Sequence, residues 1–410
     1  MKRLGILISL CLVAMVGMIY LHPIVIKKQC LSKTTISNAL ETAGVFQEFP
    51  AEVTLPWDGV NTRAIVQYSF DAKLQDEMEK LFQSYRPDYG AFVAIDATTG
   101  RVLSMISYNH ANKKVPGNLA LRATFPSASV FKVVTAAAAI AEKNFSADTT
   151  ISFNGQNHTL YRSNIIKNRV TRWTRHMTLK EAFANSVNTV FGRIGAFTVG
   201  ADELRDYAGR FGFNRKIAAD MPMQEGHCEI TDEPWALAET ASGYTRDNTM
   251  SPLQGALIAA AVVNDGVMME PYAVESIHRM DGSQIYSASP QVSQLTVDSR
   301  TASEIRSLMR ETVSSGTSRK TFRGFAKSAF GTLDVGGKTG SLTGTDPQGK
   351  YDWFIGFARG SHQKIAIAAL TVHEKLWRVK SSWLARKGIE SWFKEHGQDA
   401  ELAEAGIKTR

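Results

Sequence analysis

Short apolar runs of strand length lie near both ends of the main body of the chain. Residues 90–96 and 101–107 flank a turn that contains Gly100, which predicts a β-hairpin. Further strand-like runs follow at 351–358 and 364–372. We therefore expect one antiparallel sheet that is assembled from both ends of this region.

Helical patterns dominate the region between these strands. Residues 129–141 form an Ala-rich apolar segment, and residues 179–191 also carry helical periodicity. An amphipathic helix is expected at 381–395, ahead of a polar tail at 396–410. Early strands, a helical middle and late strands with a terminal helix predict an α+β fold.

The first residues predict a membrane anchor. Residues 4–26 are apolar and almost uncharged, and at about 1.5 Å per residue they are long enough to cross a hydrocarbon core of roughly 30 Å. A cleavable signal peptide would have a shorter apolar region and a small-x-small cleavage site. We expect an uncleaved signal anchor that crosses the cytoplasmic membrane once and leaves the main domain on the extracytoplasmic (periplasmic) side.

This interpretation divides the chain into four segments. They are a transmembrane helix at 1–28, a short juxtamembrane connector at 29–62, the main domain at 63–395 and the polar tail at 396–410. The main domain is therefore expected to follow the anchor after only a short connector.

Composition narrows the classes of function. The 47 lysines and arginines exceed the 39 aspartates and glutamates, which gives a net charge of +8. This charge suits nucleic acid, an anionic membrane surface or an anionic cell wall, but an extracytoplasmic domain is not expected to bind nucleic acid. The three cysteines have no CxxC spacing, and His227 beside Cys228 has no second ligand at a useful spacing. We expect no disulfide framework, no metal and no organic cofactor.

One candidate for chemistry is a serine three residues before a lysine. On a helix this spacing puts both side chains on one face, so the amine lies within hydrogen-bond reach of the hydroxyl. A lysine whose pKa is lowered by burial or by a neighbouring cation can be the base that activates the serine. The pattern occurs three times, at Ser129/Lys132, Ser361/Lys364 and Ser391/Lys394.

Two further short patterns are candidates. Ser-x-Asn also occurs three times, at Ser107/Asn109, Ser152/Asn154 and Ser186/Asn188. Lys-Thr-Gly occurs once, at 338–340, and Thr332 stands where a phosphate-binding P-loop would need glycine. We expect the glycines of this segment to let a strand run close to a bound ligand, namely Gly336, Gly337 and Gly340.

Order along the chain selects one copy of each pattern. Ser129 opens the Ala-rich helix, whose positive end would stabilise developing negative charge. Ser361 lies in a polar turn and Ser391 on the terminal helix, both after Lys-Thr-Gly. Ser186 and Asn188 lie inside or just after a predicted helix, between Ser129 and Lys-Thr-Gly.

In this order the motifs resemble those of the penicillin-binding transpeptidases, which share them with class A β-lactamases. The similarity covers about 62–395 and includes the hairpin turn at 96–100, the stretch 249–271 and the strand at 353–358. The resemblance implies an antiparallel sheet flanked by helices plus an all-helical subdomain.

The resemblance also implies acyl transfer from a peptide that ends in D-Ala-D-Ala. Ser129 would attack the carbonyl of the penultimate D-Ala, Lys132 would accept its proton, and Ser186 would relay a proton to the leaving amine. The implied partners are peptidoglycan stem peptides, β-lactam antibiotics as covalent inhibitors, and other proteins of cell-wall synthesis.

Substrate binding is implied for residues of the second and third motifs. Asn188 would hold Lys132 and the substrate amide, and Lys338 would supply positive charge for a carboxylate. Thr339 would hydrogen-bond the terminal carboxylate beside Gly340. The backbone N–H groups of Ser129 and Ser341 would form the oxyanion hole, in which one donor is typically worth about 3 kcal/mol.

Departures from related families leave alternatives open. Val187 replaces the aspartate of class A β-lactamases, and the chain has no Leu-Asn dipeptide, so it lacks their ExxLN deacylation loop. Asn188 argues against class D β-lactamases and penicillin-sensing receptors, which usually carry Ser-x-Val. We expect a D,D-transpeptidase with a long-lived penicilloyl adduct. The alternatives are a D,D-carboxypeptidase of the same fold and a β-lactam receptor or scaffold without turnover.

Two clusters near the end of the chain receive structural interpretations. Trp377, Trp383 and Trp392 are expected to be core or sheet-packing aromatics. Five cations are expected to form a solvated face, with contact to an anionic wall polymer or lipid as the alternative, namely Lys375, Arg378, Lys380, Arg386 and Lys387.

Overall fold

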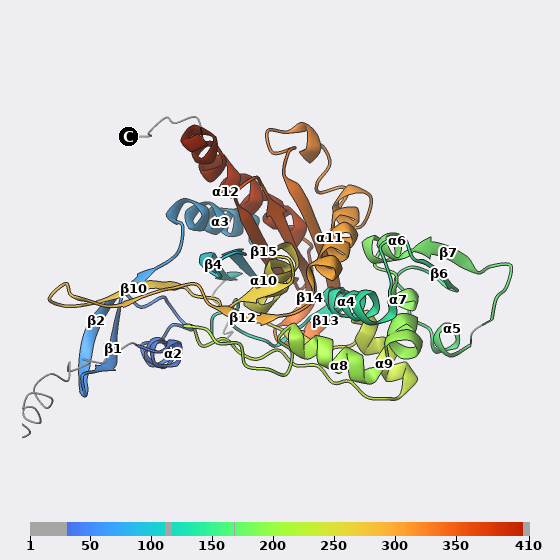
Figure 1. The fold of residues 1–410 in the computed structure, drawn as a ribbon, viewed down its shortest axis with the longest axis horizontal. Coiled ribbons are helices and arrows are strands. Elements are labelled where there is room, and N and C mark those ends of the chain that lie inside the picture. The colour runs from blue at the N-terminus through green and yellow to red at the C-terminus, as the bar shows by residue number, and fades with distance from the viewer. Residues whose placement is uncertain (1–30, 111–116, 168, 405–410) are drawn as a thin grey trace, which may run out of the picture.

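A computed structural model describes residues 31–110, 117–167 and 169–404 (Figure 1). The expected membrane anchor at 1–28 lies outside the described residues. Among the residues described, no helix is long and apolar enough to span a bilayer.

The centre of the molecule is a five-stranded antiparallel sheet in the order β13-β14-β15-β3-β4. The predicted sheet from both ends of the domain is therefore confirmed, because β15 pairs with β3. Its strands are β3 (Tyr89–Asp96), β4 (Val102–Asn109), β13 (Asp334–Thr345), β14 (Gln348–Arg359) and β15 (Lys364–His373).

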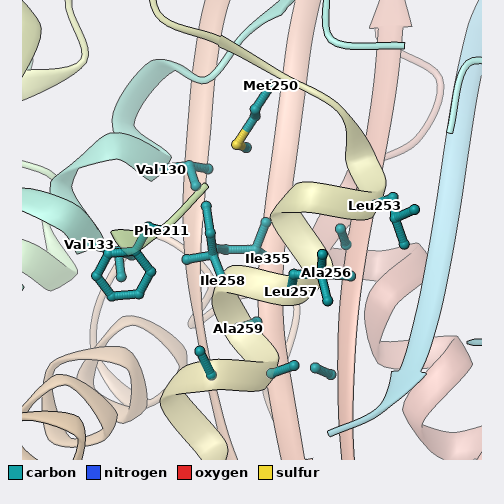
Figure 2. Close-up of a cluster of buried hydrophobic side chains, with 14 of the residues drawn as sticks. Val130, Val133, Phe211, Met250, Leu253, Ala256, Leu257, Ile258, Ala259 and Ile355 are labelled. Atoms are coloured by element: carbon teal, nitrogen blue, oxygen red, sulfur yellow. The ribbon is translucent and has the colours of Figure 1, made fainter. Parts of the chain in front are cut away.

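Helices cover both faces of this sheet (Figure 1). α3 (Ala72–Tyr85) and α12 (Ser381–Glu404) pack on one face, and α10 (Pro252–Val263) packs on the other. α10 begins after Ser251, whose side chain accepts a hydrogen bond from the Gln254 N–H, and all of its residues are buried. Figure 2 shows its side chains in one cluster with Ile355 of the sheet and with Val130 and Val133.

The region beside the sheet is mainly helical. It contains α4 (Lys132–Lys143), α5 (Arg162–Ile166), α6 (Leu179–Ala184), α7 (Asn188–Ile194), α8 (Ala201–Arg210) and α9 (Pro234–Ser242), with a single π-helical turn, η3 (Gly195–Val199). The expected all-helical subdomain needs a correction, because β6 (Thr150–Phe153) and β7 (Arg175–Thr178) form a small antiparallel hairpin within it. α11 (Ser299–Ser314) links this region to β13 of the sheet.

The predicted helix at 179–191 is wrong as a single element, because it breaks between α6 and α7. The Val187 N–H donates to the Ala182 carbonyl, and the Ser186 N–H donates to the Phe183 carbonyl. This pair of bonds is a Schellman ending, which needs a residue in the left-handed region. Ser186 occupies that place with φ +54°, where glycine is usual.

A second sheet lies to one side of the domain (Figure 1). Its order is β1-β2-β10-β11, with β1 (Glu52–Trp57), β2 (Val60–Tyr68), β10 (Val274–Arg279) and β11 (Gln284–Ser287). α2 (Lys33–Thr42) packs beside β1. The expected connector at 29–62 is therefore folded over much of its length, because β1 and β2 find their partner in β10, more than 200 residues later.

Short elements complete the fold. They are β5 (Phe125–Pro126) paired with β8 (Thr249–Met250), β9 (Val267–Met269) paired with β12 (Val292–Leu295), and the 3-10 turns η2 (Ala128–Phe131) and η4 (Phe325–Lys327). The terminal helix is longer than expected, because α12 continues to Glu404 through part of the expected polar tail.

Candidate active site

Ser129 lies in the turn that leads into α4. It belongs to η2 and is half-buried, and the preceding Ala128 has a left-handed φ of +48°. Lys132 begins α4 one turn later, and its Nζ donates a hydrogen bond of 2.8 Å to Ser129 Oγ. The predicted contact between this serine and this lysine is present.

Lys132 is fully buried, and oxygen acceptors surround its amine. Besides Ser129, the Nζ donates to Asn188 Oδ1 at 2.8 Å and to the Ser242 carbonyl at 2.5 Å. Burial, together with the nearby Lys338 ammonium, holds the pKa of Lys132 well below its usual range. In its neutral form the amine keeps two N–H donors for Asn188 Oδ1 and the Ser242 carbonyl, and its lone pair can accept the proton of the Ser129 hydroxyl, so the pair can generate a nucleophile.

The break between α6 and α7 brings the second motif to the same place. Asn188 is the first residue of α7, and its Nδ2 donates to the His158 carbonyl at 3.0 Å, which fixes its Oδ1 toward Lys132. The left-handed Ser186 points its hydroxyl to Lys338, whose Nζ donates to it at 3.0 Å. A non-glycine residue in this conformation costs of order 1 kcal/mol or more, and such strain is concentrated at functional sites.

The third motif lies on β13, an edge strand of the main sheet. Lys338 is fully buried, and burial lowers its pKa to about 7. Thr339 lies beside Thr317, with 2.6 Å between the two hydroxyl oxygens. A Cβ at Gly340 would lie 3.2 Å from the Ser127 carbonyl oxygen, so glycine here allows β13 to approach the turn that carries Ser129.

The expectation for the two earlier glycines of this segment needs a correction. A Cβ at Gly336 would lie 2.7 Å from the Phe357 ring, and one at Gly337 would lie 2.2 Å from the Phe354 ring. These glycines therefore make room for rings of the neighbouring strand β14 and not for a ligand.

A cleft of about 870 Å³ joins the three motifs. Ser129, Ser186, Asn188, Thr339, Gly340 and Ser341 line it, while Lys132 and Lys338 reach it from behind through Ser129 and Ser186. The other Ser-x-x-Lys copies lie elsewhere, with Ser361 between β14 and β15 and Ser391 on α12.

Several residues of the cleft were missed by the sequence patterns. The Ser242 carbonyl binds Lys132, and Gly243 and His158 line the cleft. Nothing in the sequence marked Ser242 or Gly243, because a backbone carbonyl and a close backbone approach leave no side-chain motif.

The prediction that Trp377 is a core or sheet-packing aromatic is wrong. Trp383 and Trp392 pack against the core under α12 as expected, whereas Trp377 is 37% exposed and lines the cleft. The five expected surface cations also separate. Lys380 lines the cleft, and Arg386 and Lys387 pair with Glu390 on α12.

The fold and the cleft define a class of serine acyltransferases, in which a buried lysine is positioned to activate the nucleophile. Comparison with family models matches residues 90–387 to the penicillin binding protein transpeptidase domain. The chain therefore belongs to the penicillin-binding protein transpeptidase family.

Curated relatives and solved structures agree with this assignment. The chain is 30% identical over 324 residues to the peptidoglycan D,D-transpeptidase PbpA of Mycobacterium tuberculosis, covering 70% of this chain and 62% of that protein. It is 25% identical over 338 residues to the stage V sporulation protein D of Bacillus subtilis, covering 77% of this chain and 50% of that protein. The chain thus spans less than two thirds of the length of these relatives.

Among solved structures, the D,D-transpeptidase domain of a peptidoglycan glycosyltransferase from Eggerthella lenta superposes with a TM-score of 0.66 at 26% identity, covering 82% of this chain and 84% of that chain. The imipenem acyl-enzyme complex of penicillin-binding protein A from M. tuberculosis gives a TM-score of 0.65 at 26% identity, with 80% of each chain covered.

Lys338 gives the stability of the domain a predictable pH dependence. Its folded-state pKa is about 7, whereas the unfolded chain keeps the proton up to about pH 10.4. Between these values the unfolded state binds more protons, so this residue makes the free energy of unfolding rise with pH, by at most about 1.4 kcal/mol per pH unit.

We expect Lys338→Met to lose this rise, because the substitution removes the titrating amine. Urea unfolding of wild type and Lys338→Met between about pH 7 and pH 10 measures the free energy of unfolding at each pH. Lys320→Met, at an exposed lysine, is the control in which this free energy should still rise with pH. A difference between wild type and Lys338→Met that does not change with pH would contradict the lowered pKa.

Proposed function

We propose that this chain is a serine D,D-transpeptidase that cross-links peptidoglycan stem peptides through an acyl-enzyme on Ser129. The observation that carries the proposal is the 2.8 Å bond between Ser129 Oγ and the Nζ of the fully buried Lys132, whose pKa is lowered. Membership of the transpeptidase family supports the same reaction.

The first half-reaction transfers an acyl group to the serine. Lys132 takes the Ser129 proton as Oγ attacks the carbonyl carbon of the penultimate D-Ala. The oxyanion that forms would be held by the backbone N–H groups of Ser129 and Ser341. The C–N bond to the terminal D-Ala then breaks, and that residue leaves as a free amine with a proton delivered through Lys132 and Ser186.

The second half-reaction transfers the acyl group from Ser129 to the amine of a second stem peptide, by the reverse of the first set of steps. An amino group of a second stem peptide attacks the ester carbonyl, loses its proton to the same base, and releases Ser129. Thr339, which lines the cleft, and Lys338, whose Nζ lies 3.0 Å from Ser186 Oγ, would hold the terminal carboxylate of the donor during the first step. No cofactor enters either step.

The acceptor distinguishes a transpeptidase from a D,D-carboxypeptidase, which transfers the same acyl group to water. The test incubates the protein with a D-Ala-D-Ala peptide and measures released D-Ala and cross-linked product with and without an added amine acceptor. We expect D-Ala release and formation of the amide product. Release with hydrolysed product alone would establish the carboxypeptidase, and no release, despite labelling by penicillin, would establish a receptor.

We further propose that the domain is held at the outer face of the cytoplasmic membrane by the apolar run at 4–26. A fusion of alkaline phosphatase after residue 410 should be active, because that enzyme folds only outside the cytoplasm, and the protein should sediment with membranes. An inactive fusion would place the domain on the other side.

Gly243 should control the position of the nucleophile. Its φ is +65°, and a Cβ there would lie 1.9 Å from the Ala128 carbonyl oxygen and 3.1 Å from the Ser129 nitrogen. We expect Gly243→Ala to displace the turn that carries Ser129, to slow acylation by benzylpenicillin at least about tenfold and to lower stability by about 3 kcal/mol.

The matched control is Gly282→Ala, because Gly282 has φ +85° and nothing within 4 Å of its Cβ position. It carries the same backbone strain without the clash, so its acylation rate should equal that of wild type. Equal acylation by both variants would show that the turn does not depend on Gly243.

A further inference from the structure

A pair of lysines surrounds Trp377 at one end of the cleft. Lys380 Nζ lies 3.4 Å and Lys350 Nζ lies 4.5 Å from the centroid of the Trp377 ring. All three residues line the cleft that contains Ser129. A cation over an aromatic face is attracted to it, so the ring holds both ammonium groups in place.

The loop that carries Trp377 and Lys380 is itself fixed. It joins β15 to α12, and His373 at its start stacks on Trp377 with 5.7 Å between ring centroids. The His373 Nε2 lies 3.0 Å from the Val379 carbonyl oxygen at the far side of the loop. The two lysines are therefore held on a constrained loop and on a strand of the sheet, β14.

This cluster has more positive charge than its surroundings compensate. Within the described part of the chain, neither Lys350 nor Lys380 forms an ion pair. Asp352 is the one carboxylate among the residues that line the cleft, and it is buried, accepts the Ser381 N–H at 2.7 Å, and has a pKa raised to about 6 by burial. Partial burial lowers the pKa of Lys380, the Asp352 carboxylate raises it and Lys350 lowers it, so two ammonium groups share one nearby carboxylate that already accepts a backbone hydrogen bond.

The register of the sheet relates the cluster to the reaction. Ser341 pairs with Asp352 and Thr343 pairs with Lys350 across β13 and β14. If the terminal carboxylate of the donor lies at Thr339 and the reacting carbonyl at Ser341, the residues upstream of D-Ala-D-Ala continue along the open edge of β13 toward Thr343. They then pass the level of Lys350.

We propose that Lys350, Lys380 and Trp377 form a subsite for a carboxylate on the donor stem peptide other than its terminal one, carried by the side chain of a residue upstream of D-Ala-D-Ala. This inference rests on the proposed function and specifies its substrate. The chain would then prefer stem peptides whose upstream side chain ends in a free carboxylate over those in which it is amidated.

The test uses two stem peptides that end in D-Ala-D-Ala and differ only in a carboxylate or a carboxamide on the third residue. D-Ala release is measured for each at low peptide concentration, where the rate reports kcat/KM. We expect wild type to prefer the carboxylate peptide about tenfold, the effect of one good charge-assisted hydrogen bond. In the double variant Lys350→Gln/Lys380→Gln the ratio should fall to about one, while Lys350→Arg/Lys380→Arg should retain a preference.

Lys375→Gln is the matched control, because Lys375 is exposed on the same loop but does not line the cleft. It should keep the wild-type ratio. A ratio of about one in wild type would overturn the inference. So would an equal loss for both peptides in the glutamine variant, which would assign the lysines to the terminal carboxylate.

Failure of the proposed function would look different. If wild type releases no D-Ala from either peptide, the two peptides are compared instead as competitors of benzylpenicillin labelling. A stronger protection by the carboxylate peptide would support the subsite, and equal protection would overturn it.

Discussion

Ser129→Ala is expected to abolish the covalent benzylpenicillin adduct that intact mass spectrometry should detect on the wild-type domain. The reason is that Ser129 Oγ is the hydroxyl bonded to the buried amine of Lys132 and open to the cleft. Loss of the nucleophile removes the covalent step itself, so the expected effect is complete and not a reduced rate.

A second serine of the same sequence pattern supplies the control. Ser361→Ala changes the serine of another Ser-x-x-Lys copy, which is exposed in the turn between β14 and β15. It should label as wild type does. Labelling that survives in Ser129→Ala would show that a different residue is acylated, and an adduct lost within seconds from wild type would indicate a β-lactamase.

Lys132→Met should slow acylation by about 10²- to 10⁴-fold, the usual contribution of a positioned general base. Methionine keeps most of the buried volume but removes the amine that contacts Ser129 Oγ, Asn188 Oδ1 and the Ser242 carbonyl. Labelling with benzylpenicillin that is quenched at a series of times measures the second-order rate constant of acylation.

A control variant and a stability measurement distinguish loss of the base from loss of the folded site. Lys394→Met removes the exposed lysine of the third Ser-x-x-Lys copy and should not change the rate. Thermal unfolding of Lys132→Met shows whether the site remains folded. A folded Lys132→Met protein that is acylated as fast as wild type would require another base, and His158, which lines the cleft, would then be a candidate.

The sequence predicted those strands that a local run of apolar residues marks. Strands β3 and β15 are apolar at nearly every position because helices cover both faces of the sheet, so both were visible as runs. In β1 and β2, buried and exposed residues alternate instead, and both strands overlap the segment expected to be a connector. Their partner β10 is remote in sequence, and pairing between such distant segments leaves no local signal.

The site was predictable to the extent that its chemistry requires side chains at fixed spacing. Ser129, Lys132, Ser186, Asn188 and Lys338 could be selected by motif and order, and the structure brings all five together. Trp377 and Lys380 could not, because an aromatic or basic residue has the same appearance in a sequence whether it faces a core, the solvent or a cleft.

The pairing of β15 with β3 also sets when the protein can become active during its synthesis. Ser129 and the hairpin of β3 and β4 leave the ribosome long before β13, β14 and β15, and β3 gains its second neighbour only when β15 arrives. Until then β3 exposes an unpaired edge of apolar residues, which is prone to aggregation. A nascent chain therefore carries Ser129 through most of translation without a complete cleft, which can form only after nearly the whole domain has emerged.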